Sequence, residues 1–337
     1  MLNANDTTYF DMSGLMIYDP VITEDDVQEP IPTVQFIDYW TGLFPFNDTF
    51  RADIHARDKK CGYSAYVEEY LVYPPKGPQP QPKALPGRGD PECEGIFYDV
   101  IEAATLINPC FNIYQVSTTC PVLWDVLGFP GSIPFTPEGT QVYFNRTDVK
   151  NAIHAPLNVD WALCAELPVF TGRDRSAPSI HTALPHVIDA TKNVIIGHGA
   201  LDMVLLANGT LLGIQNMTWG GKLGFQNRPT QPFYVPASSI ANSLSSLAAE
   251  GVFGTVITER GLTYIGVALS GHMIPQYAPS AAYRQLEFLL GRVNCLNCTV
   301  PFTTDAVAAP QNPQPLGDGT TLQEWSNTGE INRRSWS

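Results

Sequence analysis

Short apolar runs recur along the chain, and each one ends at glycine, proline or a charged residue. The first, GLMIYDPVI, covers Gly14–Ile22, the second is Val194–Ile196, and GTVITERGLTYIGVALSG covers Gly254–Gly271. Because the first run has no polar alternation, it predicts a buried strand in a sheet that is covered on both faces. The third run breaks only at Arg260-Gly261 and predicts two strands joined by a hairpin turn.

Helical patterns separate these runs. A helix is expected to end near Ile153, with Asn145, Thr147 and Asp148 as candidate caps, and three more are expected over 180–191, 203–217 and 279–291. In the last, apolar residues recur at helical spacing before Gly291. The order strand, loop, helix around residues 198–202 and again around His272 predicts an α/β fold.

A block of different texture interrupts this order between residues 23 and 141. It is rich in aromatic residues and proline, with helical patterns only at Tyr63–Tyr70 and near residues 97–106. The proline-rich segment Tyr73–Cys93 predicts an exposed loop rather than a helix. We therefore expect an α/β core made of residues 1–22 and 142–298, an insertion or cap subdomain over 23–141, and a disordered polar tail over 299–337.

Charge and composition narrow the function classes. The chain has a formal net charge of −14, only 15% charged residues and 44% hydrophobic residues, with a mean hydropathy of −0.06. Nucleic acid is not an expected partner, because it must be met by lysine and arginine. A membrane is not expected either, because no apolar run reaches about 18 residues. Acidic secreted hydrolases fit this balance.

Cysteines and glycosylation sequons indicate the compartment. The pattern favours disulfides over a metal site, because no CxxC pair faces a second one. Sequons in this number, together with the cysteines, predict the secretory pathway and a secreted or vacuolar protein. The seven cysteines are Cys61, Cys93, Cys110, Cys120, Cys164, Cys295 and Cys298, and the six sequons begin at Asn5, Asn47, Asn145, Asn208, Asn216 and Asn297.

The first residues do not provide an entry signal for that pathway. Met1–Gly14 has no basic region, no apolar region and no small-residue cleavage site, so we do not expect it to be a signal peptide. The cysteine count is also odd. We therefore expect the natural chain to begin before residue 1.

Two residues are candidates for chemistry because they follow apolar strands. Asp202 comes six residues after Ile196, and His272 three after Leu269. Loops at the carboxyl ends of strands converge on one crevice, where a carboxylate can orient an imidazole as the base half of a nucleophilic triad. In α/β-hydrolases the triad runs nucleophile, acid, histidine along the chain. The alternatives stay open that His272 is structural and that Asp202 caps the following helix.

The remaining histidines considered, His181, His186 and His198, have no partner pattern. No HExxH or comparable ligand set argues for zinc, so no metal and no organic cofactor is expected.

The motifs around both candidates resemble those of the serine carboxypeptidases, a peptidase family of the α/β-hydrolase fold. The family's Gly-x-x-Asp is matched by Gly199-Ala-Leu-Asp202 with Asn208-Gly209 after it, and its Gly-His-Met-Val-Pro by Gly271–Pro275 with Ile274 as the one change. The segment near Gly14 resembles the strand after the family's nucleophile helix, but Leu15 and Met16 replace Asn-Gly. The likeness extends to Gly291 and is greatest to fungal secreted members.

The resemblance implies a peptidase that removes carboxy-terminal residues from peptides or proteins by acyl transfer from a serine, with Asp202 and His272 as its acid and histidine. The family's serine stands in Gly-Glu-Ser-Tyr-x-Gly, and no Gly-x-Ser-x-Gly occurs in 337 residues; Gly62-Tyr63-Ser64-Ala65 is the nearest imitation. This implies a partial α/β-hydrolase fold without the nucleophile elbow, an unpaired Cys164, and a chain that is inactive as given. The alternative is a non-catalytic, hydrolase-like secreted glycoprotein that serves as a binding module.

Overall fold

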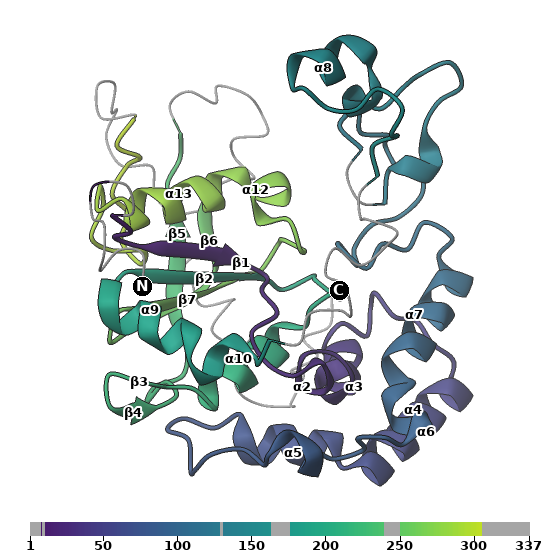
Figure 1. Ribbon diagram of the computed structural model, residues 1–337. Coiled ribbons are helices and arrows are strands. Elements are labelled where there is room, and N and C mark those ends of the chain that lie inside the picture. The colour runs from purple at the N-terminus through teal and green to yellow at the C-terminus, as the bar shows by residue number, and fades with distance from the viewer. Residues whose placement is uncertain (1–7, 9–10, 129–130, 163–175, 239–249, 305–337) are drawn as a thin grey trace, which may run out of the picture.

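The computed structural model describes residue 8 and residues 11–128, 131–162, 176–238 and 250–304 (Figure 1). Asn5, Cys164 and residues 305–337 of the predicted tail lie outside these ranges.

A five-stranded sheet lies at the centre of the fold. Its strands are β1 (Leu15–Tyr18), β2 (Val194–Gly199), β7 (Leu262–Val267), β6 (Gly251–Glu259) and β5 (Gln231–Val235), in that spatial order. The first three are parallel, and β7, β6 and β5 pair antiparallel. Arg260 and Gly261 both have positive φ, 54° and 88°, which is the backbone of a two-residue hairpin turn. The predicted hairpin is confirmed.

Helices cover both faces of the sheet. Helices α9 (Ala183–Thr191) and α10 (Ala207–Gln215) lie on one side in Figure 1, and α12 (Ile274–Tyr277) and α13 (Pro279–Leu289) on the other. The side-chain alternation of β2 matches this arrangement, because Val194 and Ile196 pack in the cluster of α9 while Ile195 packs in the cluster of α13. Burial on both faces therefore holds for β2, whose residues are all buried. The first apolar run does form a strand, but the prediction that it is buried is wrong, because β1 lies at the end of the described sheet and its four residues are only half-buried.

Residues 23–141 are far more helical than the sequence pattern predicts. One hydrophobic cluster joins most of their helices to Leu201, Met203, Leu206 and Leu212, so the block packs against α10 and the loop before it. Its helices are α2 (Asp25–Gln28), α3 (Pro30–Tyr39), α4 (Asp48–Cys61), α5 (Tyr63–Tyr70), α6 (Pro91–Glu94) and α7 (Ile96–Ile107), with 3-10 turns η1 (Pro82–Ala84) and η2 (Ile133–Phe135).

The prediction of a helix-free loop over Tyr73–Cys93 is wrong. Both η1 and α6 lie in it, and each begins at a proline, Pro82 and Pro91. Proline is tolerated in the first turn of a helix because that N–H has no partner within the helix. The helix predicted over 203–217 is shorter, since α10 begins only at Ala207. The smaller elements are η3 (Tyr143–Asn145), α8 (Thr147–Ala152), η4 (Ser179–His181), β3 (Thr218–Trp219) and β4 (Lys222–Leu223).

Three disulfides join six of the seven cysteines: Cys61 with Cys93, Cys110 with Cys120, and Cys295 with Cys298. The first ties α4 to α6 across 32 residues, the second closes a 10-residue loop and the third spans 3 residues. The prediction that the cysteines form disulfides is confirmed for these six.

We expect the longest of these loops to contribute most to stability. Replacing Cys61 and Cys93 by serine should lower the free energy of unfolding by about 3–4 kcal/mol, because the bond removes loop-closure entropy from the unfolded chain. The matched control replaces Cys295 and Cys298 by serine, which should cost only about 2 kcal/mol because its loop is short. Urea unfolding followed by tryptophan fluorescence measures both values, and an equal loss in the two variants would contradict this entropic account.

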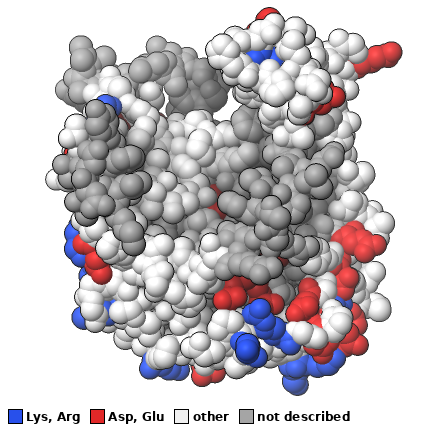
Figure 2. Space-filling view, viewed as in Figure 1, with Lys and Arg blue, Asp and Glu red and all other residues white. Residues whose placement is uncertain are grey.

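Charged side chains gather along the lower edge of the face in Figure 2, where both signs are mixed. Ion pairs within residues 23–141 bring both signs together, including Arg57 with Asp99 at 2.6 Å and Arg88 with Asp26 at 2.9 Å. In the described part of the chain, no helix has the length and apolar character that a bilayer crossing requires.

Candidate active site

Asp202 and His272 lie together at the carboxyl ends of two neighbouring parallel strands. Asp202 is in the loop after β2, and His272 is in the loop between β7 and α12. Strands β2 and β7 pair in register from Val194 with Leu262 to Gly199 with Val267, so their following loops emerge side by side. Adjacent parallel strands thus bring together two residues that are 70 positions apart in the sequence.

The two side chains form a direct hydrogen bond. His272 Nδ1 lies 2.9 Å from Asp202 Oδ2. Asp202 is fully buried, whereas the His272 side chain is 25% exposed. With its proton on Nδ1 donated to Asp202, the imidazole carries its lone pair on Nε2, the arrangement of a general base with an orienting carboxylate. The structure places the two predicted residues as such a pair would require.

Backbone donors fix the other oxygen of Asp202. Oδ1 accepts hydrogen bonds from the N–H groups of Val204, at 2.7 Å, and Leu205, at 3.3 Å. Helix α10 begins later, at Ala207, with Leu206 as its N-cap residue. The suggestion that Asp202 caps the following helix is therefore wrong; its carboxylate instead closes the loop, with the second oxygen left for His272.

Loop 110–120, which the Cys110–Cys120 disulfide closes, hydrogen-bonds to both the loop of Asp202 and the loop of His272. His272 N donates to Tyr114 O at 2.8 Å, Met203 N donates to Ile113 O at 2.9 Å, and Val116 N donates to Leu201 O at 3.0 Å. The rings of Tyr114 and His272 also meet edge to face, with centroids 5.6 Å apart. These three backbone hydrogen bonds to one loop fix the positions of Asp202 and His272 relative to each other.

Two further buried residues beside the pair were not among the predicted site residues. Asp19 follows β1, is 3% exposed, and accepts a hydrogen bond from Gly199 N at 2.7 Å. His198, within β2, is fully buried with Nε2 2.7 Å from Leu205 O. Burial lowers the pKa of His198 and raises that of Asp19 well above its usual value, with the negative charge of Asp202 adding to the rise. The only sequence feature that draws attention to Asp19 is the Asp-Pro pair after Tyr18, and this pair does not indicate a site residue.

A metal ion has ligand atoms available here. One ligand atom each from Asp19, Asp202 and His272 lies within 4.8 Å of the others. Asp202 and His272, however, already satisfy each other through their hydrogen bond, which a shared cation would break.

The remaining predicted residues lie elsewhere. Ser64 is in α5, far from α12 in Figure 1, and it hydrogen-bonds Asp58. His181 and His186 are exposed on η4 and α9. Among the described sequons, two are exposed and three are half-buried: the first group is Asn47 and Asn297, the second Asn145, Asn208 and Asn216.

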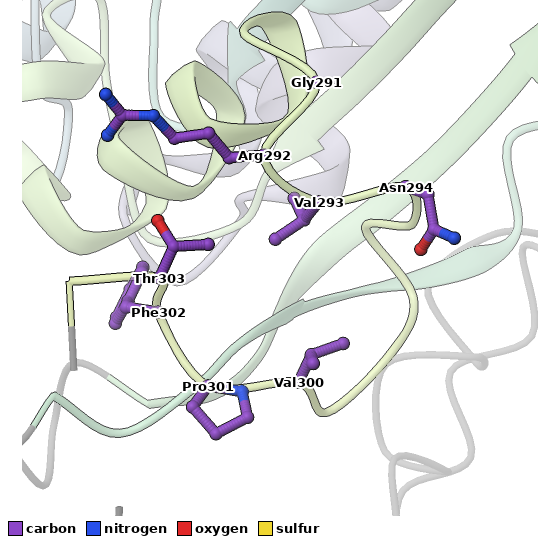
Figure 3. A pocket seen from close by; sticks show the side chains of 8 residues that line it. All are labelled: Gly291, Arg292, Val293, Asn294, Val300, Pro301, Phe302 and Thr303. Carbon is purple, nitrogen blue, oxygen red and sulfur yellow. The ribbon is translucent and has the colours of Figure 1, made fainter. Parts of the chain in front are cut away.

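A pocket of about 580 Å³ lies away from the pair. It is lined by residues 291–294, after α13, and by residues 300–303 (Figure 3). Its polar side chains are Arg292, Asn294 and Thr303, with no acid and base facing each other, so the pocket gives no reason to move the candidate site.

Comparisons with known proteins point to one family. The serine carboxypeptidase family model matches residues 2–291. A probable serine carboxypeptidase of Arthroderma benhamiae is 52% identical over 298 residues, and serine-type carboxypeptidase F of Aspergillus niger is 44% identical over 312. Each alignment covers 88% of this chain but only 55% and 58% of those relatives. The chain thus spans little more than half the length of the curated relatives it matches.

A solved structure shows the same fold. The prohormone-processing carboxypeptidase Kex1(Δ)p of Saccharomyces cerevisiae superposes with a TM-score of 0.56 at 19% identity, covering 86% of this chain and 58% of that one. The α/β-hydrolase fold predicted from the sequence is confirmed. Because the family model matches residues 2–291, which is most of this chain, the chain belongs to the serine carboxypeptidase family.

Proposed function

We propose that this chain carries the acid and histidine of a serine carboxypeptidase, and that the serine is supplied by a longer product of the same gene. The observation that carries the proposal is the 2.9 Å hydrogen bond between His272 Nδ1 and Asp202 Oδ2 at neighbouring strand ends. The absence of Gly-x-Ser-x-Gly from the 337 residues supports the second part. The substrates would be peptides or proteins with a free carboxy terminus.

The mechanism follows from the protonation of the pair. His272 Nε2 takes the proton of the serine hydroxyl as the oxygen attacks the last peptide carbonyl. It then gives that proton to the departing amine, so that an acyl-enzyme forms. In the second half of the reaction, His272 Nε2 takes a proton from water as the water oxygen attacks the acyl carbonyl. It then gives that proton to the serine oxygen, and the shortened peptide is released. Asp202 keeps the ring oriented and stabilises the imidazolium that forms in each step. Without the serine, these residues can only move a proton, and the chain as given is inactive.

We further infer that residues 23–141 act as a subdomain that holds the site together. The support is the set of backbone bonds from Ile113, Tyr114 and Val116 to the two loops. The three disulfides and the sequons support a protein that matures in the secretory pathway and is secreted or vacuolar.

Fluorophosphonate labelling tests the proposed function. The 337-residue chain should not react. A gene product that includes an upstream Gly-Glu-Ser-Tyr segment should be labelled at that serine and should release carboxy-terminal residues from test peptides. Labelling of the short chain at Ser64 would contradict the proposal. A stop codon close upstream of Met1, confirmed in transcripts, would instead support the non-catalytic glycoprotein.

A further inference from the structure

A second carboxyl lies beside the Asp202–His272 pair and is not explained by it. The Asp19 side chain has no exposed surface. Its Oδ1 accepts a hydrogen bond from Gly199 N, but among the described residues Oδ2 is buried without a hydrogen-bond donor. A buried carboxylate oxygen that lacks a donor is costly, so a charge on Asp19 would need stabilisation from another group.

Positive charge does not provide that stabilisation. In the described part of the chain, no lysine or arginine pairs with either carboxyl; the only ion-pair partners are His198 and His272. His198 Nε2 lies 3.5 Å from Asp19 Oδ1, but it also lies 2.7 Å from Leu205 O and must carry a hydrogen to donate there. Its Nδ1 is buried without a partner. His198 is therefore neutral, which agrees with its lowered pKa.

Two titratable tyrosines, Tyr18 and Tyr264, also lie near Asp19, and both are uncharged. Burial raises the pKa of Tyr18 to about 12 and raises that of Tyr264 further. Among the described residues, the groups near Asp19 that can still carry a charge are thus Asp202 and, beyond it, His272. Two ionised carboxylates in this enclosed place would repel each other with little screening.

One proton shared between the carboxyls removes the repulsion, and the hydrogen bonds show which side chain holds it. Asp202 has three donors, from Val204 N, Leu205 N and His272 Nδ1. Asp19 has one, from Gly199 N. Because the better solvated carboxylate keeps the charge, the proton stays on Asp19. The raised pKa of Asp19, caused by burial and by the charge of Asp202, agrees with this assignment.

We propose that Asp19 is a positioning residue that remains protonated and donates a hydrogen bond to Asp202, so that a single, fixed negative charge faces His272. This proposal rests on the proposed function only for the catalytic role of that charge; the protonation of Asp19 does not depend on it. The Asp19 side chain has no exposed surface, and it acts through Asp202.

The test follows the ring signal of His272 during a pH titration by NMR of the 337-residue chain labelled with ¹⁵N-histidine, with His272→Gln to assign the signal. Asp19→Asn keeps a neutral donor and should leave the titration midpoint within about 0.3 pH units of the wild type. Asp19→Ala removes the donor, strengthens the pull of Asp202 on the imidazolium, and should raise the midpoint by about 0.5 units or more. Asp189→Asn, a surface control, should change nothing.

Other patterns overturn the proposal. If Asp19 were ionised, both substitutions would remove a negative charge and lower the midpoint. If Asp19 were merely structural, neither substitution would move it. A shift of the wild-type signal on adding zinc, absent in Asp19→Asn, would show that the cluster binds a cation instead.

A second measurement stands if Asp19→Ala fails to fold. The infrared difference between wild type and Asp19→Asn at neutral pH should contain the carbonyl band of a protonated carboxylic acid in the wild type; its absence would refute the shared proton. Neither measurement needs the serine. A failed peptidase assay on the longer gene product with an intact titration pattern would therefore refute the proposed function alone.

Discussion

Replacing His272 by glutamine in the proposed serine-bearing gene product is expected to lower kcat for peptide hydrolysis by roughly 10⁴-fold or more. The loss follows from chemistry, since glutamine cannot take the serine proton. Asp202→Asn should cost roughly 10⁴-fold as well, because an amide at this position favours the wrong imidazole tautomer. Release of the terminal amino acid from a blocked dipeptide under saturating substrate measures both effects.

The control for this experiment is His186→Gln, a change at an exposed histidine on α9. It should retain wild-type kcat. Combining the His272 and Asp202 changes should cost little more than the first alone, because the two residues act as one unit. Full multiplication of the two losses, or residual activity near wild type in either variant, would contradict the assigned roles.

Gly271→Ala is expected to disturb the site without touching its side chains. A Cβ at residue 271 would overlap the carbonyl oxygen of Tyr114, the atom that accepts the hydrogen bond from His272 N, and would crowd Gln115 as well. Either the histidine loop or loop 110–120 has to move. A displacement of about 1 Å at the base costs on the order of 10²-fold in rate. We therefore expect a loss of kcat of that size in the serine-bearing gene product.

Gly266→Ala is the matched control, since it lies on β7 close to the same loop. A Cβ there would find its nearest neighbour, Thr255 Oγ1, at 3.5 Å, an ordinary contact. This variant should keep most of its activity and its circular dichroism spectrum. If Gly271→Ala were as active as Gly266→Ala, the contact with Tyr114 would not be what positions His272.

The acid and histidine could be predicted because each follows an apolar run and lies in a short motif. Asp19 could not be predicted in the same way. Its hydrogen bond to Gly199 joins residues 180 positions apart, and it depends on β1 pairing with β2, which no local pattern specifies. The contact of loop 110–120 with the site could not be predicted either. Its hydrogen bonds to the site use backbone atoms, which every residue type has, so the sequence does not mark them.

The sequence pattern does not predict helices α3 and α4, for both local and tertiary reasons. Helix α3 has prolines at residues 30 and 32, which resemble a helix breaker until their place in the first turn is known. Helix α4 is polar along most of its length, and its start depends on Asn47, whose side chain accepts from Phe50 N. Asn47 also begins a sequon, and the sequence pattern alone does not mark it as a helix cap. Both helices are stabilised by packing in the cluster around α5 and α7, a tertiary effect that periodicity alone does not contain.

The position of β1 at the edge of the sheet has a consequence for folding. Asp19 reaches Gly199 only after β1 has paired with β2, while Asp202 and His272 meet only after β2 has paired with β7. Contacts between such distant parts of a chain form late, because loop closure must precede them. We expect the two carboxyls and the imidazole to come together among the last folding steps, so that a partly folded chain lacks this hydrogen-bonded cluster.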